Sequence, residues 1–291
     1  MQSLFINSST SSHKILVRWW KNAQANPIPS NGTLFLLHGM GEYSLRYREF
    51  ASFLTQWGFD VLSFDHPGYG MTAKEGGYKA NATFGEMIEE ANGVLNFWFR
   101  EGPNSNSDLA SAPLIFMGHS MGALILLSWM TRSQPIDDKL RPQKLVVSSP
   151  PLGLRLKVPE WKDKVAQILY RFAPNLPLGS EISPDFLSAD RVSNYSFAQD
   201  PYHVSTASAK LYISLKESIQ EVNDNSSKLK VPSLCFVGSD DPIVSPDAFK
   251  QYFEKLSIEK KFIEHHGMKH ECLNEIGREK VFQEVLSWIL A

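Results

Sequence analysis

Short apolar runs alternate along this chain with longer stretches in which apolar residues recur at helical spacing. Buried runs separated by amphipathic helices are typical of a parallel sheet with crossover helices, so the expected fold class is α/β. Two runs near the start, around 4–6 and 14–19, predict an antiparallel edge. The runs that predict the other strands are 33–37, 60–64, 113–117, 144–148, 233–237 and 261–265. The stretches that predict helices are 47–57, 84–99, 121–131, 246–256 and 278–289.

The segment 151–228 breaks this alternation, because it holds no convincing parallel strand. Its apolar residues Trp161, Val165, Ile168, Leu169 and Phe172 recur at helical spacing. Residues 174–179 predict a loop, and 207–222 predict another helix. We therefore expect a helical cap over 151–228, inserted in a core made of 1–150 and 229–291. The alternative is an ordinary set of surface helices whose apolar residues only pack. Exposure of Val165, Ile168 and Leu169 would instead favour contact with a membrane.

The composition narrows the class of protein and the kind of partner. Hydrophobic residues make up 43% and charged residues 21% of the 291 positions, as in ordinary globular proteins. The formal net charge is −2, and no long run of Lys or Arg occurs. These features predict no nucleic-acid surface and favour a neutral or weakly charged small-molecule substrate.

The cysteines and the apolar segments indicate in which cellular compartment the protein is expected. Cys235 and Cys272 are too few for a zinc site or a disulfide framework, and they predict reduced thiols. Residues 1–12 are rich in Ser and Asn and lack an apolar h-region, so no signal peptide is predicted. The longest apolar stretch, 123–127, is too short to span a membrane. We therefore expect a cytoplasmic protein.

The segment 118–122 reads Gly-His-Ser-Met-Gly, which matches G-x-S-x-G, and it lies between a predicted strand and a predicted helix. In that context the pattern predicts a nucleophile elbow, with Ser120 as the nucleophile. The glycines are needed because so tight a turn leaves no room for neighbouring Cβ atoms. The helix that begins there also favours negative charge near Ser120.

A serine hydroxyl becomes a good nucleophile only when a base takes its proton. In this type of fold the chain order is Ser, then an acid, then His, so both partners should follow Ser120. His270 lies in a loop between the last predicted strand and the last predicted helix, and spacing favours it over His266. Asp240 and Asp241 follow the predicted strand 233–237, and either carboxylate could orient the histidine.

The oxyanion of the reaction needs two backbone N–H donors. One is expected from Met121, the residue after the nucleophile. The other is expected from Met40, within the loop His38-Gly39-Met40-Gly41-Glu42 after an early strand. The alternative for that loop is a simple glycine turn.

Together these segments resemble the monoacylglycerol lipase and lysophospholipase family of α/β-hydrolases. The resemblance covers the chain from about Thr33 to the C-terminus, the cap included, and it selects Asp241 over Asp240 and His270 over His266. It departs at Met71-Thr72, where a small residue and Ser are common. The segments that carry it are 38–42 followed by Arg46-Tyr47 (H-G-x-G-E, then R-Y), 65–70 (D-x-x-G-x-G), 118–123 (G-H-S-M-G-A), 238–244 (G-x-x-D-x-x-V), 267–275 around His270-Glu271, and in the cap 173–179 and 200–202.

The resemblance implies an α/β-hydrolase fold, with a mostly parallel eight-stranded sheet flanked by helices. It implies a serine hydrolase that cleaves the carboxylic ester of a single-acyl lipid, monoacylglycerol or lysophospholipid, through an acyl-enzyme. It also implies a mobile apolar cap that can touch a membrane or micelle. This chemistry requires no metal or organic cofactor, so none is expected.

Three other functions stay open on the sequence. The chain could be another hydrolase of the same fold, such as a short-chain carboxylesterase or an aminopeptidase that cleaves amides. It could be an acyltransferase in which an alcohol outcompetes water. It could also be a binding protein that keeps the fold without catalysis.

Overall fold

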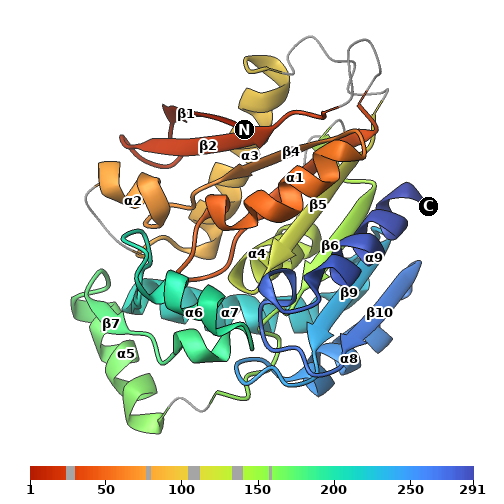
Figure 1. Ribbon diagram of the computed structural model, residues 1–291. Coiled ribbons are helices and arrows are strands. Elements are labelled where there is room, and N and C mark those ends of the chain that lie inside the picture. Colours follow the sequence, from red (N-terminus) through yellow and green to blue (C-terminus); the bar gives the residue numbers. More distant parts are fainter. Residues whose placement is uncertain (24–29, 77–79, 104–111, 133–139, 157–158) are drawn as a thin grey trace.

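The computed structural model describes residues 1–23, 30–76, 80–103, 112–132, 140–156 and 159–291. Its main feature is an eight-stranded sheet in the order β1-β2-β4-β3-β5-β6-β9-β10 (Figure 1). β2 is antiparallel to β1 and β4, and the other pairs of neighbours are parallel. The strands are β1 (Gln2–Asn7), β2 (Lys14–Trp20), β3 (Gly32–Leu37), β4 (Phe59–Phe64), β5 (Leu114–His119), β6 (Lys144–Ser148), β9 (Ser233–Gly238) and β10 (Lys260–His265).

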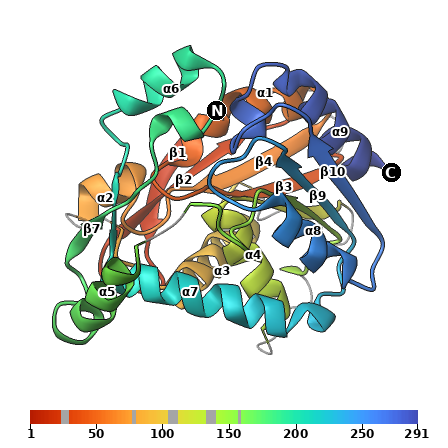
Figure 2. The same ribbon diagram turned by 90° about the horizontal axis from the view of Figure 1, so that it is seen from below.

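Helices cover both faces of this sheet (Figure 2). Successive side chains of β3 point to opposite faces, and both faces are apolar. Leu34 and Leu36 belong to the buried core on one face, and Phe35 and Leu37 belong to the buried core on the other. The helices on the Leu34 face are α1 (Arg48–Gln56) and α9 (Arg278–Leu290). The helices on the Phe35 face are α3 (Phe84–Arg100), α4 (Met121–Thr131), α7 (Ala209–Asp224) and α8 (Pro246–Glu254). The shorter helical segments that the structure describes include α2 (Gly70–Gly76) and 3₁₀ helices at Ser44–Tyr47, Pro184–Phe186, Ser226–Lys228 and Cys272–Asn274.

The strands and helices that the apolar pattern predicts outside the insertion are all present, including the antiparallel N-terminal edge, and their ends differ by no more than two residues. The pattern misses the α-helix α2, because the segment Gly70–Gly76 is too short and too polar to show helical spacing. Its first turn is fixed by a polar contact instead, because the Met71 N–H donates to Asp65 Oδ2 at 2.9 Å.

The segment between β6 and β9 contains α5 (Glu160–Phe172), α6 (Arg191–Ala198) and α7. It also contains an antiparallel pair of three-residue strands, β7 (Pro177–Gly179) and β8 (Thr206–Ser208). The loop predicted over 174–179 is therefore wrong at its last three residues. A strand of three residues is too short for an alternating pattern to reveal it.

The parts of this segment differ in how they pack. α7 packs against α4 in the layer that covers the sheet. α5, β7 and α6 all lie beyond the end of the sheet where β5 leads into α4 (Figure 1), with α6 well apart from α5 and β7 in the second view (Figure 2). In α5 the only buried residue is Ala166. Its exposed apolar residues are Trp161, Val165, Ile168, Tyr170 and Phe172.

Within the part of the chain that the structure describes, no helix is both long and apolar enough to cross a bilayer.

Candidate active site

Ser120 lies on a strained turn between β5 and α4. Its φ is 51° and its ψ is −118°, a conformation that non-glycine residues rarely adopt, and its N–H donates to the carbonyl of Ser148 at 2.8 Å. The glycines on either side explain how the turn fits. A Cβ on Gly118 would lie 2.5 Å from the carbonyl oxygen of Gly122, and one on Gly122 would lie 2.2 Å from that of Leu37. Both contacts are with backbone, so neither position can hold a larger residue without moving the chain.

His270 lies beside Ser120, with its Nε2 2.9 Å from the Ser120 Oγ. Its ring is buried, while His266, the alternative histidine, is exposed. The loop that carries His270 approaches the end of β9 closely at Gly238, where a Cβ would lie 2.2 Å from the carbonyl oxygen of Met268. The structure therefore brings His270, and not His266, to the serine.

Asp241 contacts the other side of the histidine ring. Its Oδ2 is 2.7 Å from Nδ1 of His270. Its Oδ1 accepts the backbone N–H groups of Ile243 and Val244 at 2.8 and 3.0 Å, which fixes the carboxylate in its loop. Asp240 is exposed and accepts the hydroxyl of Ser239 at 2.7 Å. Of the two neighbouring acids, only Asp241 reaches His270.

The charges around His270 favour a ring that can take a proton. Burial by itself lowers the pKa of His270, but the charge of Asp241, its hydrogen bond and the charges of Glu271 and Glu42 together hold the pKa above its usual value. Burial raises the pKa of Asp241, while the charge of His270, their mutual hydrogen bond and the two backbone donors lower it further than burial raises it. Asp241 is therefore a carboxylate at neutral pH, and it stabilises the protonated ring.

The residues of the two predicted oxyanion donors lie close to Ser120. Met40 and Met121 line the same cavity as the serine. Among the described residues, neither backbone N–H has a hydrogen-bond acceptor. The loop that carries Met40 lies directly against the nucleophile, because a Cβ on Gly39 would be 3.3 Å from the Cβ of Ser120. Two free N–H groups near the serine hydroxyl are what an oxyanion site requires.

A buried ion cluster connects this loop with the loop of His270. Arg46 Nη2 lies 2.6 Å from Oε2 of Glu271, and Arg46 Nε lies 3.6 Å from Oε2 of Glu42. Glu42 Oε1 in turn accepts the N–H of Gly39 at 2.6 Å. The guanidinium group also stacks over the ring of Phe197 in α6, 4.1 Å from its centroid. Arg46 therefore links the loop of Met40, the loop of His270 and α6.

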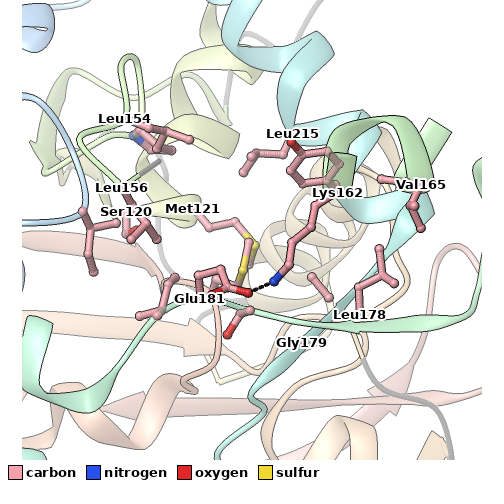
Figure 3. Close-up of a pocket in the computed structure, with 18 of the residues that line it drawn as sticks. Ser120, Met121, Leu154, Leu156, Lys162, Val165, Leu178, Gly179, Glu181 and Leu215 are labelled. Atoms are coloured by element: carbon pink, nitrogen blue, oxygen red, sulfur yellow. Dashed lines mark hydrogen bonds and ion pairs between the residues drawn. The ribbon is translucent and has the colours of Figure 1, made fainter. Parts of the chain in front are cut away.

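A cavity of about 240 Å³ leads away from Ser120 towards α5 and β7 (Figure 3). Most of its wall is apolar. Its few polar side chains include Lys162 and Glu181, which form an ion pair with each other, and Tyr212. The apolar residues of the wall are Met40, Met121, Pro151, Leu154, Leu156, Trp161, Val165, Ala166, Leu178, Ile182, Ala207, Leu215 and Ile243.

The sequence did not identify this wall as a unit. Its residues belong to separate patterns, such as Met40, Met121 and Ile243 in three different motifs and Val165 and Leu215 in two different predicted helices. Leu154, Leu156 and Leu178 lie in irregular or very short elements where no spacing rule applies. Within the described residues, no group of three or more His, Cys, Asp or Glu side chains could hold a metal ion. Both cysteines are buried and free.

Comparison with known proteins assigns the chain to a family. Residues 28–277 match the family described as serine aminopeptidase, S33. The chain belongs to this family. It is 29% identical to the phospholipase YtpA of Bacillus subtilis (strain 168), over 86% of this chain and 92% of that protein. It is 26% identical to the monoglyceride lipase of Homo sapiens, over 94% of this chain and 86% of that one.

Solved structures confirm the fold expected from the sequence. The crystal structure of the monoacylglycerol lipase of Paleococcus ferrophilus superposes with a TM-score of 0.80 at 25% identity, covering 94% of this chain and 98% of that one. The chain therefore has the α/β-hydrolase fold, and the resemblance to the monoacylglycerol lipase and lysophospholipase family is confirmed. It is a serine hydrolase, and its relatives group it with the carboxylic ester hydrolases.

Proposed function

We propose that this chain hydrolyses the ester of a single-acyl lipid, monoacylglycerol or a lysophospholipid, through an acyl-enzyme on Ser120. His270 acts as general base and then general acid, Asp241 orients it, and the N–H groups of Met40 and Met121 hold the oxyanion. The observation that carries the proposal is the continuity between Ser120 and an apolar cavity. The relatives named as lipases and a phospholipase support it.

The distances fit a two-step acyl transfer. His270 Nε2, 2.9 Å from Oγ, takes the Ser120 proton while Oγ bonds to the carbonyl carbon. The two N–H groups stabilise the negative oxygen of the tetrahedral intermediate. The bond to the alcohol then breaks, and His270 returns the proton to the leaving oxygen. Water repeats the sequence on the acyl-enzyme, releasing the acid and restoring the Ser120 hydroxyl.

The cavity supports the choice of a lipid over a small polar ester. Each buried methylene group contributes about 0.8 kcal/mol to the free energy of binding. A wall of leucine, methionine and tryptophan side chains therefore favours the binding of a long acyl chain. Among the described residues that line the cavity, Glu181 is the only carboxylate, and it is paired with Lys162. An aminopeptidase would need a free carboxylate for the substrate's ammonium group, so the cavity favours an acyl chain over a peptide N-terminus.

We further propose that residues 151–228 form a cap over this cavity, and that the cap contacts a membrane or micelle surface through α5. Ile168 is 59% and Phe172 is 78% exposed, an unusual state for large apolar side chains on one helix. Val165 is also exposed, and Leu169 is half-buried. An apolar helix face of this kind binds at the boundary of headgroups and acyl chains.

The test is a comparison of substrates. The p-nitrophenyl esters from acetate to palmitate are assayed beside 1-monooleoylglycerol, a lysophosphatidylcholine and leucine p-nitroanilide, with Ser120→Ala as the control. We expect Ser120-dependent rates that peak at medium or long chains and include the monoglyceride. Activity confined to acetate and butyrate would contradict the lipid substrate, and activity confined to the anilide would favour an aminopeptidase. Product analysis with added glycerol separates hydrolysis from acyl transfer to an alcohol.

A further inference from the structure

His38 lies directly after β3 and is fully buried, yet no step of the proposed reaction uses it. Both of its ring nitrogens have partners. Nδ1 is 2.8 Å from the carbonyl oxygen of Gly39, and Nε2 is 2.9 Å from the backbone nitrogen of His66. The first contact is with the backbone of the loop that carries the expected oxyanion donor, and the second is with the backbone of the loop after β4.

The two partners determine the tautomer of His38. A carbonyl oxygen can only accept, so Nδ1 must carry the hydrogen. A backbone N–H can only donate, so Nε2 must be unprotonated. Burial lowers the pKa of His38, which agrees with a ring that stays neutral. The side chain is therefore a fixed donor aimed at the carbonyl of Gly39.

That carbonyl belongs to the same peptide unit as the N–H of Met40. The unit is planar and trans, so its C=O and N–H point in opposite directions. A bond that holds the Gly39 oxygen on one side thus holds the Met40 N–H on the other. The peptide before it is held too, since the Gly39 N–H donates to Glu42 Oε1 at 2.6 Å. Met40 and Ser120 line the same cavity.

We infer that His38 is a positioning residue for the oxyanion site, and that its Nδ1–H fixes the orientation of the Met40 N–H through the Gly39–Met40 peptide. This inference rests on the proposed role of Ser120 and not on the length of the acyl chain. It predicts that the donor at Nδ1 matters more for the reaction than the acceptor at Nε2. The two functions of the ring can be separated by substitution.

The matched variants are His38→Asn and His38→Gln. The Asn amide nitrogen lies about where Nδ1 does, so it can donate to Gly39 but leaves the His66 N–H without its acceptor. The longer Gln side chain reaches about as far as Nε2, so its amide oxygen can accept from His66 while the donor to Gly39 is lost. His266→Asn, in an exposed position, is the control for the same exchange of residues.

The readouts are kcat and KM for a p-nitrophenyl ester, corrected for sites titrated with a fluorophosphonate. They also include the affinities for an alkyl trifluoromethyl ketone and for a non-electrophilic ether of the same chain length. The ketone forms a hemiketal whose oxygen needs the N–H donors, whereas the ether does not. A residue that only maintained the fold would lower the number of titratable sites and leave kcat per site and the ratio of the two affinities unchanged.

We expect His38→Gln to lower kcat and the ketone affinity by about 10²-fold, within the range observed when one oxyanion donor is removed. KM and the ether affinity should stay within about twofold, and His38→Asn should keep kcat within about tenfold of the unchanged chain. The inference is wrong if His38→Asn loses as much as His38→Gln, or if only the number of sites falls. Absence of any Ser120-dependent reaction in the unchanged chain would overturn the inference and the proposed function together. Activity on short esters alone would overturn the lipid substrate only.

Discussion

Oδ2 of Asp241 and Nδ1 of His270 are 2.7 Å apart, although the two residues lie 29 positions apart on different loops. The carboxylate holds the ring in the tautomer that leaves Nε2 free to take a proton from Ser120. It also raises the pKa of His270 against the effect of burial. This one contact therefore affects both the rate and its dependence on pH.

Asp241→Asn should lower kcat/KM by about 10⁴-fold, since the amide favours the wrong tautomer. Esters are cleaved only when His270 is unprotonated, so the rate of the unchanged chain should rise with pH through a pKa above the usual 6.5. Asp241→Asn removes the charge that raises the pKa of His270 most, while Glu271 and Glu42 still raise it and burial still lowers it, so the acid limb of the residual activity should move to lower pH.

The matched control is Asp240→Asn, because Asp240 is exposed and does not contact His270. Its rate and pH profile should equal those of the unchanged chain. A profile that does not move in Asp241→Asn would show that another group controls the titration.

Gly122→Ala should destabilise the fold by more than about 2 kcal/mol, because the added Cβ would lie 2.2 Å from the carbonyl oxygen of Leu37, which is backbone. Gly85 offers a control within α3, since a Cβ there has no neighbour closer than 3.7 Å. Gly85→Ala should change stability by no more than about 1 kcal/mol. Urea unfolding measures both, and equal stabilities would contradict the close packing of the elbow.

The ion pair of Lys162 and Glu181 should limit how well the cavity accepts long chains, since it is the charged part of a mostly apolar wall (Figure 3). The double variant Lys162→Met with Glu181→Leu should shift the best p-nitrophenyl ester to a longer chain. Each added methylene that becomes buried should raise kcat/KM by up to about fourfold, the equivalent of about 0.8 kcal/mol.

The charge swap Lys162→Glu with Glu181→Lys keeps the pair and should keep the original preference. Stability should change little in both variants, because the two side chains are partly exposed. An unchanged chain-length profile in the apolar variant would mean that the acyl chain does not reach this wall.

Ile168→Ser with Phe172→Ser should weaken binding to anionic or zwitterionic vesicles by about 10²-fold, since each apolar side chain contributes about 1.5 kcal/mol or more when buried in the interface. Neither residue lines the cavity, so hydrolysis of a soluble p-nitrophenyl ester should be unaffected. Val192→Ser with Tyr195→Ser removes exposed apolar residues from α6 and is the control in a vesicle sedimentation assay. An equal loss of vesicle binding in both variants would mean that the membrane contact depends on exposed apolar residues in general and not on α5.

The sequence predicted the sheet and its helices because their residues are buried on a regular spacing. β3 and β5, for example, are buried at every position. It predicted the neighbourhood of Ser120, His270 and Asp241 because each follows a strand, and parallel strands place their carboxyl ends at one edge of the sheet. The structure adds the distances, and it separates His270 and Asp241 from their neighbours by burial.

Other features could not be read from local patterns. The contact between Arg46 and Glu271 joins residues 225 positions apart. β7 is only three residues long, so its apolar pattern carries no period. The cavity wall combines single residues from several elements, and its shape depends on how α5 packs. Such contacts are set by tertiary packing, which local spacing does not encode.

The role of Ser120 as nucleophile is tested most directly by mass spectrometry after reaction with a long-chain alkyl p-nitrophenyl phosphonate. We predict one adduct per chain, on the peptide that contains Ser120, formed at a rate that falls at least about 10²-fold in His270→Ala and absent from Ser120→Ala. An adduct on another residue, or no adduct in the unchanged chain, would contradict the account.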